Sequence, residues 1–517
     1  MTDHTLQSRR QWLRGSATAI GAAALAPTAL VSDAGAQPPN RKALIGGLIN
    51  QLGQQATWRS SELRLARRIT LGLNEVEVAR VQALGYDAYL EEQLNPSRID
   101  DSAMDARVQA VYGRLLGFTP RQLLDFDELG THYFDAQLPM RMLVSERALY
   151  SRRQLQERLF EFWSDHVHVP IWNFRGLTPI HLEQHVRPHV LSTVGALIRA
   201  SMRSTSMLLY LDQVWSTRFG LNENYARELM ELHTVGWDGG YTQADVVGLA
   251  RVLTGWSMDV NGNFEYKAGN HDFGAKETFG MSFPARPQAF TGTSGMEEGI
   301  AFCEMLISHP QTKRFIATKL LRWFVTPTPS PAQIQAVINA YGTDGDIKAM
   351  LRVVLSRANL AKAPAKLKRP FHYGISALRA TGATVNPVTD VRRDYISLVY
   401  PINDMGHAFG NWPTPDAYPD RAEFWAGLIV DRWNAVNNHL VQVDNTRPGR
   451  AVLNLATFAA DGTSDGVIAV INRRLFGGEM SPELAAELRY ALRSGVTNAR
   501  VLTAVRLAVC APEFQFY

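Results

Sequence analysis

Apolar residues recur at helical spacing along most of the chain. Side chains at positions i, i+3, i+4 and i+7 share one face of a helix, so this repeat predicts amphipathic helices. The helical pattern covers residues 60–71, 75–84, 86–94, 140–163, 186–203, 312–324, 331–341, 347–355 and 371–381. The helix at residues 75–84 has both end signals, because Asn74 can act as its N-cap and Gly85 as its stop.

Strand signals are few. Residues 260–280 contain several glycines and predict a loop with a short hairpin near residues 264–266. Residues 401–421 are rich in Pro, Gly and Asp and predict a second irregular segment. Long loops in a compact fold are often functional. We therefore expect a mainly α fold, a large multi-helical single unit with long irregular loops and at most a minor β-hairpin.

The first 36 residues predict an export signal. An arginine pair at positions 9–10 precedes a mildly apolar, alanine-rich stretch, and small residues at positions 34–36 suit a cleavage site. Together these features are typical of a twin-arginine signal peptide. Residues 37–57 predict a linker and residues 58–517 a single α-helical domain. We expect a soluble periplasmic or secreted protein with no stable membrane span in the mature chain, because no later segment has an apolar run of about 20 residues.

The composition is that of an ordinary globular protein. Of 517 residues, 46% are hydrophobic and 20% are charged, and the formal net charge is +4. A nucleic-acid-binding protein usually has a basic stripe, and only short basic clusters occur here, so we expect no nucleic-acid partner. The two cysteines, Cys303 and Cys510, are too few for a disulfide framework. Both lie in apolar surroundings, and we favour two buried thiols over a single bridge.

A helix predicted at residues 222–236 separates its side chains into two faces. Asn222 is the expected N-cap and Gly236 the expected stop. At about 100° per residue, the apolar residues share one face, which includes His233 and predicts a core histidine. The polar face comprises Glu223, Asn224, Arg227, Glu228 and Glu231, and within it the spacing i, i+4, i+7 aligns Asn224, Glu228 and Glu231.

This polar stripe has two interpretations. Two carboxylates and an amide on one face could bind a divalent cation or act as general acid and general base. The alternative is a solvated helix face with an ion pair between Glu223 and Arg227, which is common in helices. The helix leads into a second motif at residues 239–256, in which Thr242 and Asp245 have capping-box spacing.

Histidines in two other segments add candidate metal ligands. His166 and His168 would point the same way in an extended chain and could chelate one metal, although a single His-x-His is a weak signal. His271 and Asp272 lie in the glycine-containing loop, where they suit a ligand or a base, although turns also use aspartate. The motifs of serine hydrolases, nucleotide enzymes and zinc proteases are absent from the sequence, which disfavours those classes.

The run from residue 222 to residue 256 resembles the signature of an exported bacterial family, the domain of unknown function 1800. Supporting pieces are Phe162-Trp163 with His166, Tyr210-Leu211-Asp212, His271-Asp272 with Lys276, His309-Pro310 with Lys319-Leu320 and Phe324, Lys366 with Lys368 and Pro370, Trp412-Pro413-Thr414-Pro415-Asp416 with Tyr418-Pro419, and Pro512-Glu513-Phe514-Gln515. The chain departs from the family pattern at His168 and at Gly406-His407. The resemblance implies export, a largely helical unit and frequent pairing with an exported sulfatase-like family, but no agreed reaction.

We therefore expect an exported metal-dependent enzyme that hydrolyses or modifies an extracytoplasmic polysaccharide or other polymer. The twin-arginine route carries folded proteins, often with a cofactor already inserted, which favours a bound divalent metal ion. In this hypothesis the catalytic residues are Glu228, Glu231, Arg227 and Asn224, and the metal ligands are Glu228, Glu231, His166, His271 and Asp272.

The alternative hypothesis is a non-catalytic helical scaffold or binding protein that acts with an exported sulfatase-like partner. In that case the same polar residues would form a buried structural network. Convergence of Glu228, Glu231, His166 and His271 in an open cleft would favour the enzyme. Dispersal or burial of these side chains would favour the scaffold.

Overall fold

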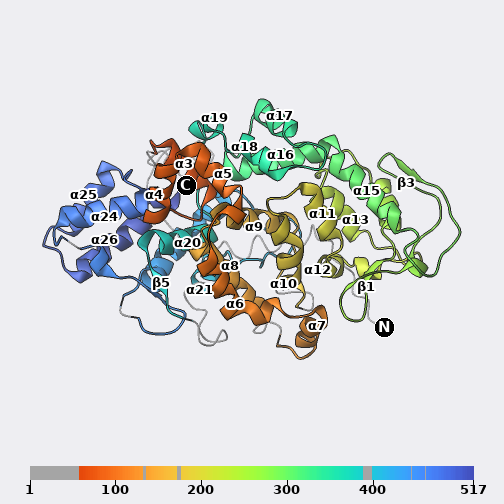
Figure 1. Cartoon of the computed structure of the whole chain (residues 1–517), viewed down its shortest axis with the longest axis horizontal. Coiled ribbons are helices and arrows are strands. Elements are labelled where there is room, and N and C mark those ends of the chain that lie inside the picture. The colour runs from red at the N-terminus through yellow and green to blue at the C-terminus, as the bar shows by residue number, and fades with distance from the viewer. Residues whose placement is uncertain (1–57, 132–135, 172–175, 388–398, 444, 460) are drawn as a thin grey trace, which may run out of the picture. The chain divides into compact units, whose positions relative to one another are not determined.

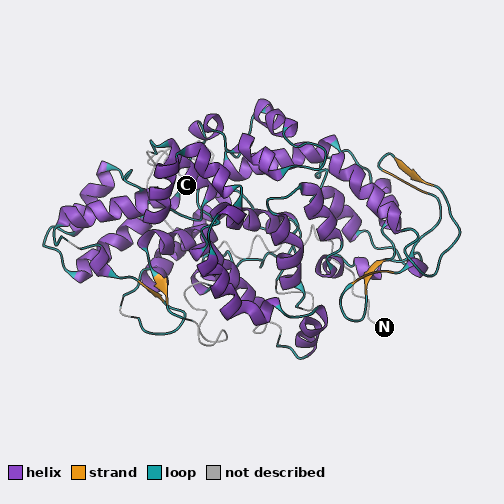
Figure 2. Ribbon diagram, in the orientation of Figure 1, coloured by secondary structure: helices purple, strands orange, loops and turns teal. Residues whose placement is uncertain are grey.

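The computed structural model describes residues 58–131, 136–171, 176–387, 399–443, 445–459 and 461–517, all of which belong to one compact unit (Figure 1). The predicted signal peptide and linker lie outside these residues. Helices dominate the described chain, as Figure 2 shows, and the mainly α class is confirmed. Of the helices described, none is both long and apolar enough to cross a membrane.

The helices of the first half follow the apolar pattern closely. Asn74 accepts a hydrogen bond from the backbone N–H of Glu77, and Gly85 ends the same helix with a φ of 74°, as the sequence predicts. The helices are α3 (Ser61–Ile69), α4 (Glu75–Leu84), α5 (Tyr86–Gln93), α6 (Ser102–Leu116), α7 (Pro120–Glu128), α8 (Leu138–Tyr150), α9 (Gln154–His166), α10 (Thr178–Ile180), α11 (Val194–Met202), α12 (Thr205–Tyr210), α13 (Asn224–Glu231) and α14 (Gln243–Val252).

The helices of the second half have the same kind of start signals, since many begin after a Ser, Thr or Asp N-cap. They are α15 (Met296–Ser308), α16 (Pro310–Phe324), α17 (Pro331–Asn339), α18 (Ile347–Val354), α19 (Arg357–Ala361), α20 (Pro370–Thr381), α21 (Tyr400–Asp404), α22 (Ala422–Trp425), α23 (Ile429–Ala435), α24 (Ser464–Phe476), α25 (Pro482–Ala491) and α26 (Asn498–Cys510). The last three pack against one another (Figure 1).

The strands form small antiparallel pairs. The predicted hairpin near residues 264–266 is confirmed as β1 (Trp256–Met258) paired with β2 (Phe264–Tyr266). Two further pairs occur among the described residues, where β3 (Lys276–Thr278) meets β4 (Met281–Phe283) and β5 (Thr384–Val385) meets β6 (Ala451–Val452). Each pair is too short to form a layer of its own, so the core is made by helices.

Two long helical runs are interrupted. The run at residues 140–163 divides into α8 and α9 at Ser151, whose hydroxyl donates to Asp101 and whose carbonyl accepts from the side chain of Gln154. The run at residues 186–203 is α-helical only from Val194, because a 3₁₀ turn that contains Pro188 precedes it. Polar contacts of Ser151 accompany the first interruption and a proline the second, and apolar spacing reveals neither.

Several elements meet near the polar motifs. Helix α14 packs against α13, α15 and β3, and α16 packs against α15, α17 and α18. Thr242 and Asp245 form the predicted capping box at the start of α14. Cys303 and Cys510 are both free thiols, Cys303 buried and Cys510 half-buried, so the preference for unpaired cysteines agrees with the structure.

Candidate functional site

The amide and the guanidinium of the α13 stripe are engaged in local contacts. Asn224 donates from Nδ2 to Asp212 Oδ2 at 3.0 Å, and Asp212 has a left-handed backbone with a φ of 60°. Arg227 donates to Glu223 at 3.1 Å and to Gln243, the first residue of α14, at 2.8 Å. The ion pair of the alternative interpretation is therefore present, and it also ties α13 to α14.

The two carboxylates of the stripe differ in their surroundings. Glu228 is buried, with 7% of its surface exposed. Glu231 is half-buried and accepts a hydrogen bond from the hydroxyl of Tyr241 at 3.3 Å. The burial of Glu228 departs from a simple solvated helix face.

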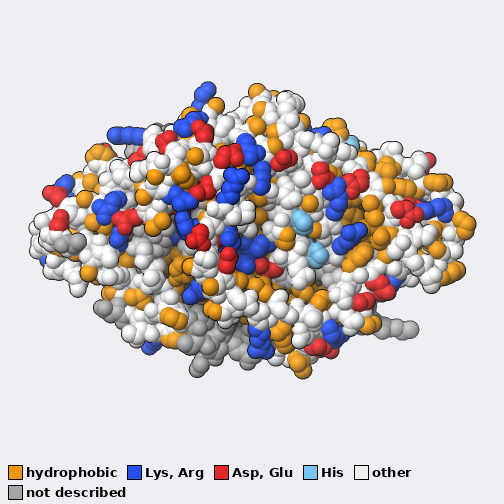
Figure 3. Space-filling model, viewed as in Figure 1, with side chains coloured by type: hydrophobic (Ala, Val, Ile, Leu, Met, Phe, Trp, Pro, Cys, Tyr) orange, Lys and Arg blue, Asp and Glu red, His pale blue; other side chains and the backbone are white. Residues whose placement is uncertain are grey.

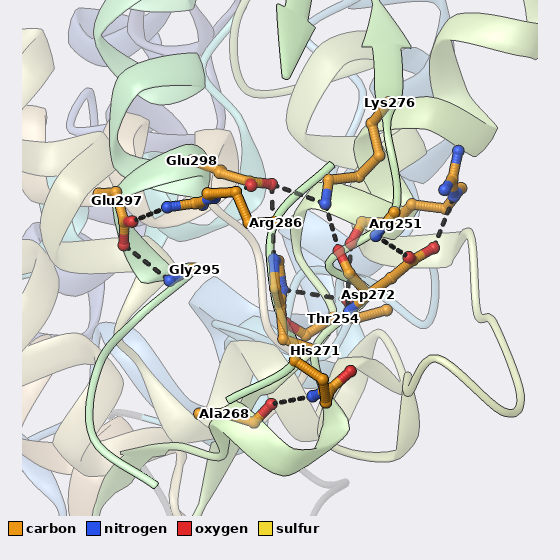
Figure 4. Close-up of polar contacts among 12 residues, drawn as sticks. Arg251, Thr254, Ala268, His271, Asp272, Lys276, Arg286, Gly295, Glu297 and Glu298 are labelled. Carbon is orange, nitrogen blue, oxygen red and sulfur yellow. Dashed lines mark hydrogen bonds and ion pairs between the residues drawn. The ribbon is translucent and has the colours of Figure 1, made fainter. Parts of the chain in front are cut away.

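A second polar group surrounds the carboxylate of Glu298 on α15 (Figure 4). Lys276 Nζ lies 2.9 Å from Glu298 Oε2, and His271 Nε2 lies 3.4 Å from the same oxygen. Arg286 Nη2 lies 2.5 Å from Oε1. We call these four residues the Glu298 cluster. Three basic side chains from residues 271–286 thus converge on one helix carboxylate and hold this segment against α15.

Asp272, the other predicted ligand in this loop, lies at the edge of the Glu298 cluster (Figure 4). Its Oδ2 accepts from Arg251 of α14 at 2.7 Å, and its Oδ1 accepts from the backbone N–H of Gly274 at 2.8 Å. His271 Nδ1 lies 2.8 Å from the carbonyl of Thr254, which requires a proton on Nδ1. The two residues therefore have structural partners in α14 and α15.

The pKa of Glu298 reflects this environment. Burial favours the neutral acid, but hydrogen bonds from His271, Lys276 and Arg286 outweigh burial and lower the pKa to about 2. The carboxylate is therefore ionised over the physiological range, and its charge is shared by several donors.

A third polar group surrounds Lys319 on α16. Lys319 Nζ donates a hydrogen bond of 2.9 Å to Nδ1 of His166. His166 is the last residue of α9. His166 Nε2 lies 3.0 Å from the carbonyl of His233, just beyond α13, and donates to it. Both ring nitrogens of His166 are thus engaged, which leaves no lone pair for a metal ion in this arrangement.

Carboxylates and further cations surround this contact. Arg369 lies 2.8 Å from Asp165 and 3.7 Å from Glu161, and Lys366 lies 3.1 Å from Asp420. The outer members, Asp165 and Asp420, remain partly accessible, whereas Arg369 and Glu161 are buried. We call the set made by Glu161, Asp165, His166, Lys319, Lys366, Arg369 and Asp420 the Lys319 cluster.

Burial shifts the proton affinities in the Lys319 cluster. It lowers the pKa of Lys319 to about 8, and the opposing charges of Asp165 and Asp420 reduce this effect only in part. Burial and then the neighbouring Lys319 ammonium lower the pKa of His166 well below its usual range. An amine that loses its proton near pH 8 is a candidate general base, and perturbed pKa values are common at functional sites.

The structure separates the predicted site residues into three places. His166 belongs to the Lys319 cluster, His271 and Asp272 belong to the loop fastened to Glu298, and the other four lie on α13. Over the described ranges, no group of three or more His, Cys, Asp or Glu side chains is arranged to hold a metal ion. The sequence analysis assigned no chemical role to Lys319. The one available signal was a lysine placed beside the apolar residues Ile316 and Leu320, which the structure shows to be buried.

Comparison with known proteins gives one match. A family model described as "Protein of unknown function (DUF1800)" matches residues 64–516. A search of curated proteins and a search of solved structures both give no match.

A substitution at Glu298 tests how much the Glu298 cluster contributes to stability. We expect Glu298→Gln to lower the free energy of unfolding by about 3–5 kcal/mol, because it leaves the buried Lys276 without its carboxylate. Since the folded-state pKa lies below the ordinary value of 4.5, this contribution is present above about pH 4.5 and is lost as the pH falls towards 2. Urea unfolding at pH 7 and at pH 3 measures both effects.

Glu297 is the matched control, because it is the neighbouring residue, pairs with the same Arg286 and is exposed. We expect Glu297→Gln to change stability by less than about 1 kcal/mol. Equal losses in the two variants would contradict a special role for Glu298.

Proposed function

We propose that the chain, which belongs to the DUF1800 family of unknown function, is an exported enzyme that hydrolyses or modifies an extracytoplasmic polysaccharide or other polymer. We assign proton transfer to Lys319. The observation that supports this assignment is the 2.9 Å contact between Lys319 Nζ and His166 Nδ1, within a partly accessible group of carboxylates and cations.

The contact suits Lys319 to act as a general base. The neutral amine keeps one N–H directed at His166, which orients the lone pair away from that ring. It can then take a proton from a water molecule, whose oxygen attacks the polymer, or from the polymer itself in an elimination.

An exposed aromatic patch supports a polymeric substrate. Phe219 is 80% exposed and Phe290 is 69% exposed. The guanidinium of Arg218 lies over both rings, 4.4 and 5.7 Å from their centroids, and donates to Gln288 at 2.6 Å. Hydrophobic side chains lie among charged ones on the molecular surface (Figure 3). Flat rings beside amide and guanidinium groups suit stacking against sugar rings, and exposed apolar patches often mark binding sites.

The metal dependence that the sequence favours stays a prediction, as do the catalytic roles of Glu228 and Glu231. His166 would have to give up its contact with Lys319 or with the carbonyl of His233 to bind a metal. Elemental analysis of the purified protein tests the metal directly.

A non-catalytic scaffold acting with an exported sulfatase-like partner is the second candidate. The observation in its favour is that His166, His271 and Glu228 are buried, the two histidines in separate hydrogen-bond networks. This candidate predicts that alanine at Glu228 and Glu231 lowers the melting temperature and that no polymer is turned over.

Lys319 provides the test of the enzyme. In Lys319→Arg we expect kcat to fall about 10²–10⁴-fold, because a guanidinium cannot act as a base near neutral pH. For the natural chain we expect kcat to rise as the pH passes about 8, where the Lys319 amine loses its proton. Turnover of a panel of extracytoplasmic polysaccharides, followed by mass spectrometry of the products, measures the rate and distinguishes hydrolysis from elimination.

Lys313 is the matched control on the same helix, since it is half-buried and its amine donates to the carbonyl of Gly342. Lys313→Arg should leave kcat and its pH profile unchanged. An unchanged rate in Lys319→Arg would refute the assignment, and absence of turnover on every polymer would favour the scaffold.

The aromatic patch has its own test. We expect the double substitution Phe219→Ala and Phe290→Ala to weaken binding to the substrate polysaccharide about tenfold, because two stacking surfaces are lost. Retention on the insoluble polymer measures this. Tyr490 is the control, because it is also exposed and also stacks with an arginine, Arg493. If Tyr490→Ala weakens binding as much as the double substitution, the patch has no special role.

A further inference from the structure

A small cavity lies where residues 366–368 pair with residues 515–517 beside α3 and α20. Its volume is about 20 Å³, and Arg67, Lys368 and His372 are among its lining residues. A cavity of this size holds one particle comparable to a water molecule. The cavity is independent of the proposed reaction, because none of these three residues belongs to the Lys319 cluster.

The imidazole of His372 has no hydrogen-bond partner in the described part of the chain. It is 1% exposed, and both of its ring nitrogens lack a partner. The ring of Tyr517 covers it at 4.5 Å between centroids. A buried N–H without an acceptor costs about 1–3 kcal/mol, so a ligand in the cavity would relieve this cost.

The ammonium of Lys368 is in a similar position. Lys368 is buried, and its Nζ lies 3.7 Å from the ring centroid of Phe514. The hydrogen bonds found among the described residues include no acceptor for this ammonium. Nearby, two guanidinium nitrogens of Arg68, Nε and Nη1, also lack partners within the described chain. Burial, and then the charges of Arg67 and Arg432, lower the pKa of Lys368 well below its usual range, so an opposite charge in the cavity is needed to hold the protonated form.

The other charged groups at the cavity are already engaged. Arg67 donates to Glu479 and to the carbonyl of Phe476. Glu513, the lining carboxylate, accepts hydrogen bonds from both the backbone N–H and the hydroxyl of Ser481. The unused groups near the cavity are therefore mainly donors, and the second ring nitrogen of a neutral His372 is the unused acceptor among them. A water molecule needs acceptors for two hydrogens and would find one at His372, whereas an anion only accepts.

We propose that this cavity binds a small monovalent anion such as chloride, held by the ammonium of Lys368 and a ring N–H of His372. The nearby Arg67 and Arg68 contribute positive charge. The anion replaces the missing acceptor at the point where the C-terminal residues pack against α20. Its binding stabilises the folded chain by mass action, since the unfolded chain has no such site.

Bromide is the probe, because it resembles chloride and scatters anomalously. We expect a bromide soak of crystals of the full chain to give one anomalous peak between Lys368 and His372. We expect the melting temperature to rise by about 1–2 °C when chloride replaces gluconate at constant ionic strength. A peak-free cavity, or a cavity whose density is that of water, would overturn the proposal.

Lys368→Met should abolish the chloride dependence of the melting temperature, because it removes the charge and keeps the length of the side chain. Lys362, which is exposed on the surface, is the control, and Lys362→Met should retain the dependence. Retention of the dependence in Lys368→Met would also overturn the proposal. If Lys368→Met does not fold, the bromide peak and the chloride response of the natural chain decide the question.

Discussion

The structure depends on the pairing of charges inside a helical core. A charged side chain that leaves water costs several kcal/mol unless an opposite charge or strong hydrogen bonds compensate it. This chain buries many charges, among them Arg158, Glu161, Glu298 and Arg369. Each of these four has an oppositely charged partner. Arg369 and Asp165 are far apart in sequence, so their contact both neutralises charge and fixes how distant helices meet.

This constraint separates structural clusters from the candidate reactive one. The carboxylate of Glu298 is buried, ionised and contacted by three basic side chains. This arrangement is typical of a structural ion-pair cluster. Lys319 differs because its nearest polar partner is an imidazole and its opposing carboxylates are farther away or partly solvated. An amine held in this way loses its proton more readily than an ordinary lysine. Lys319 is therefore available for proton transfer in a way that Glu298 is not.

The sequence predicts the helices well and the site poorly, for one physical reason. Helix signals are local, so apolar spacing, the cap at Asn74 and the box formed by Thr242 and Asp245 could be identified from neighbouring residues. The partners within the clusters are not local. Lys319 contacts His166 across 153 residues of sequence, and no periodicity specifies that pairing. The α13 carboxylates could be predicted as a candidate site because three polar residues align on one helix, and this pattern is visible without tertiary structure.

The proposed role of Lys319 depends on an amine that loses its proton near pH 8. Labelling the lysine side chains with ¹⁵N and following the Lys319 resonance with pH, with Lys319→Arg for its assignment, measures that proton affinity directly. We expect a pKa of about 8 for Lys319. A pKa at or above the ordinary lysine value of 10.5 would show a permanently charged side chain and would contradict a general base at this position.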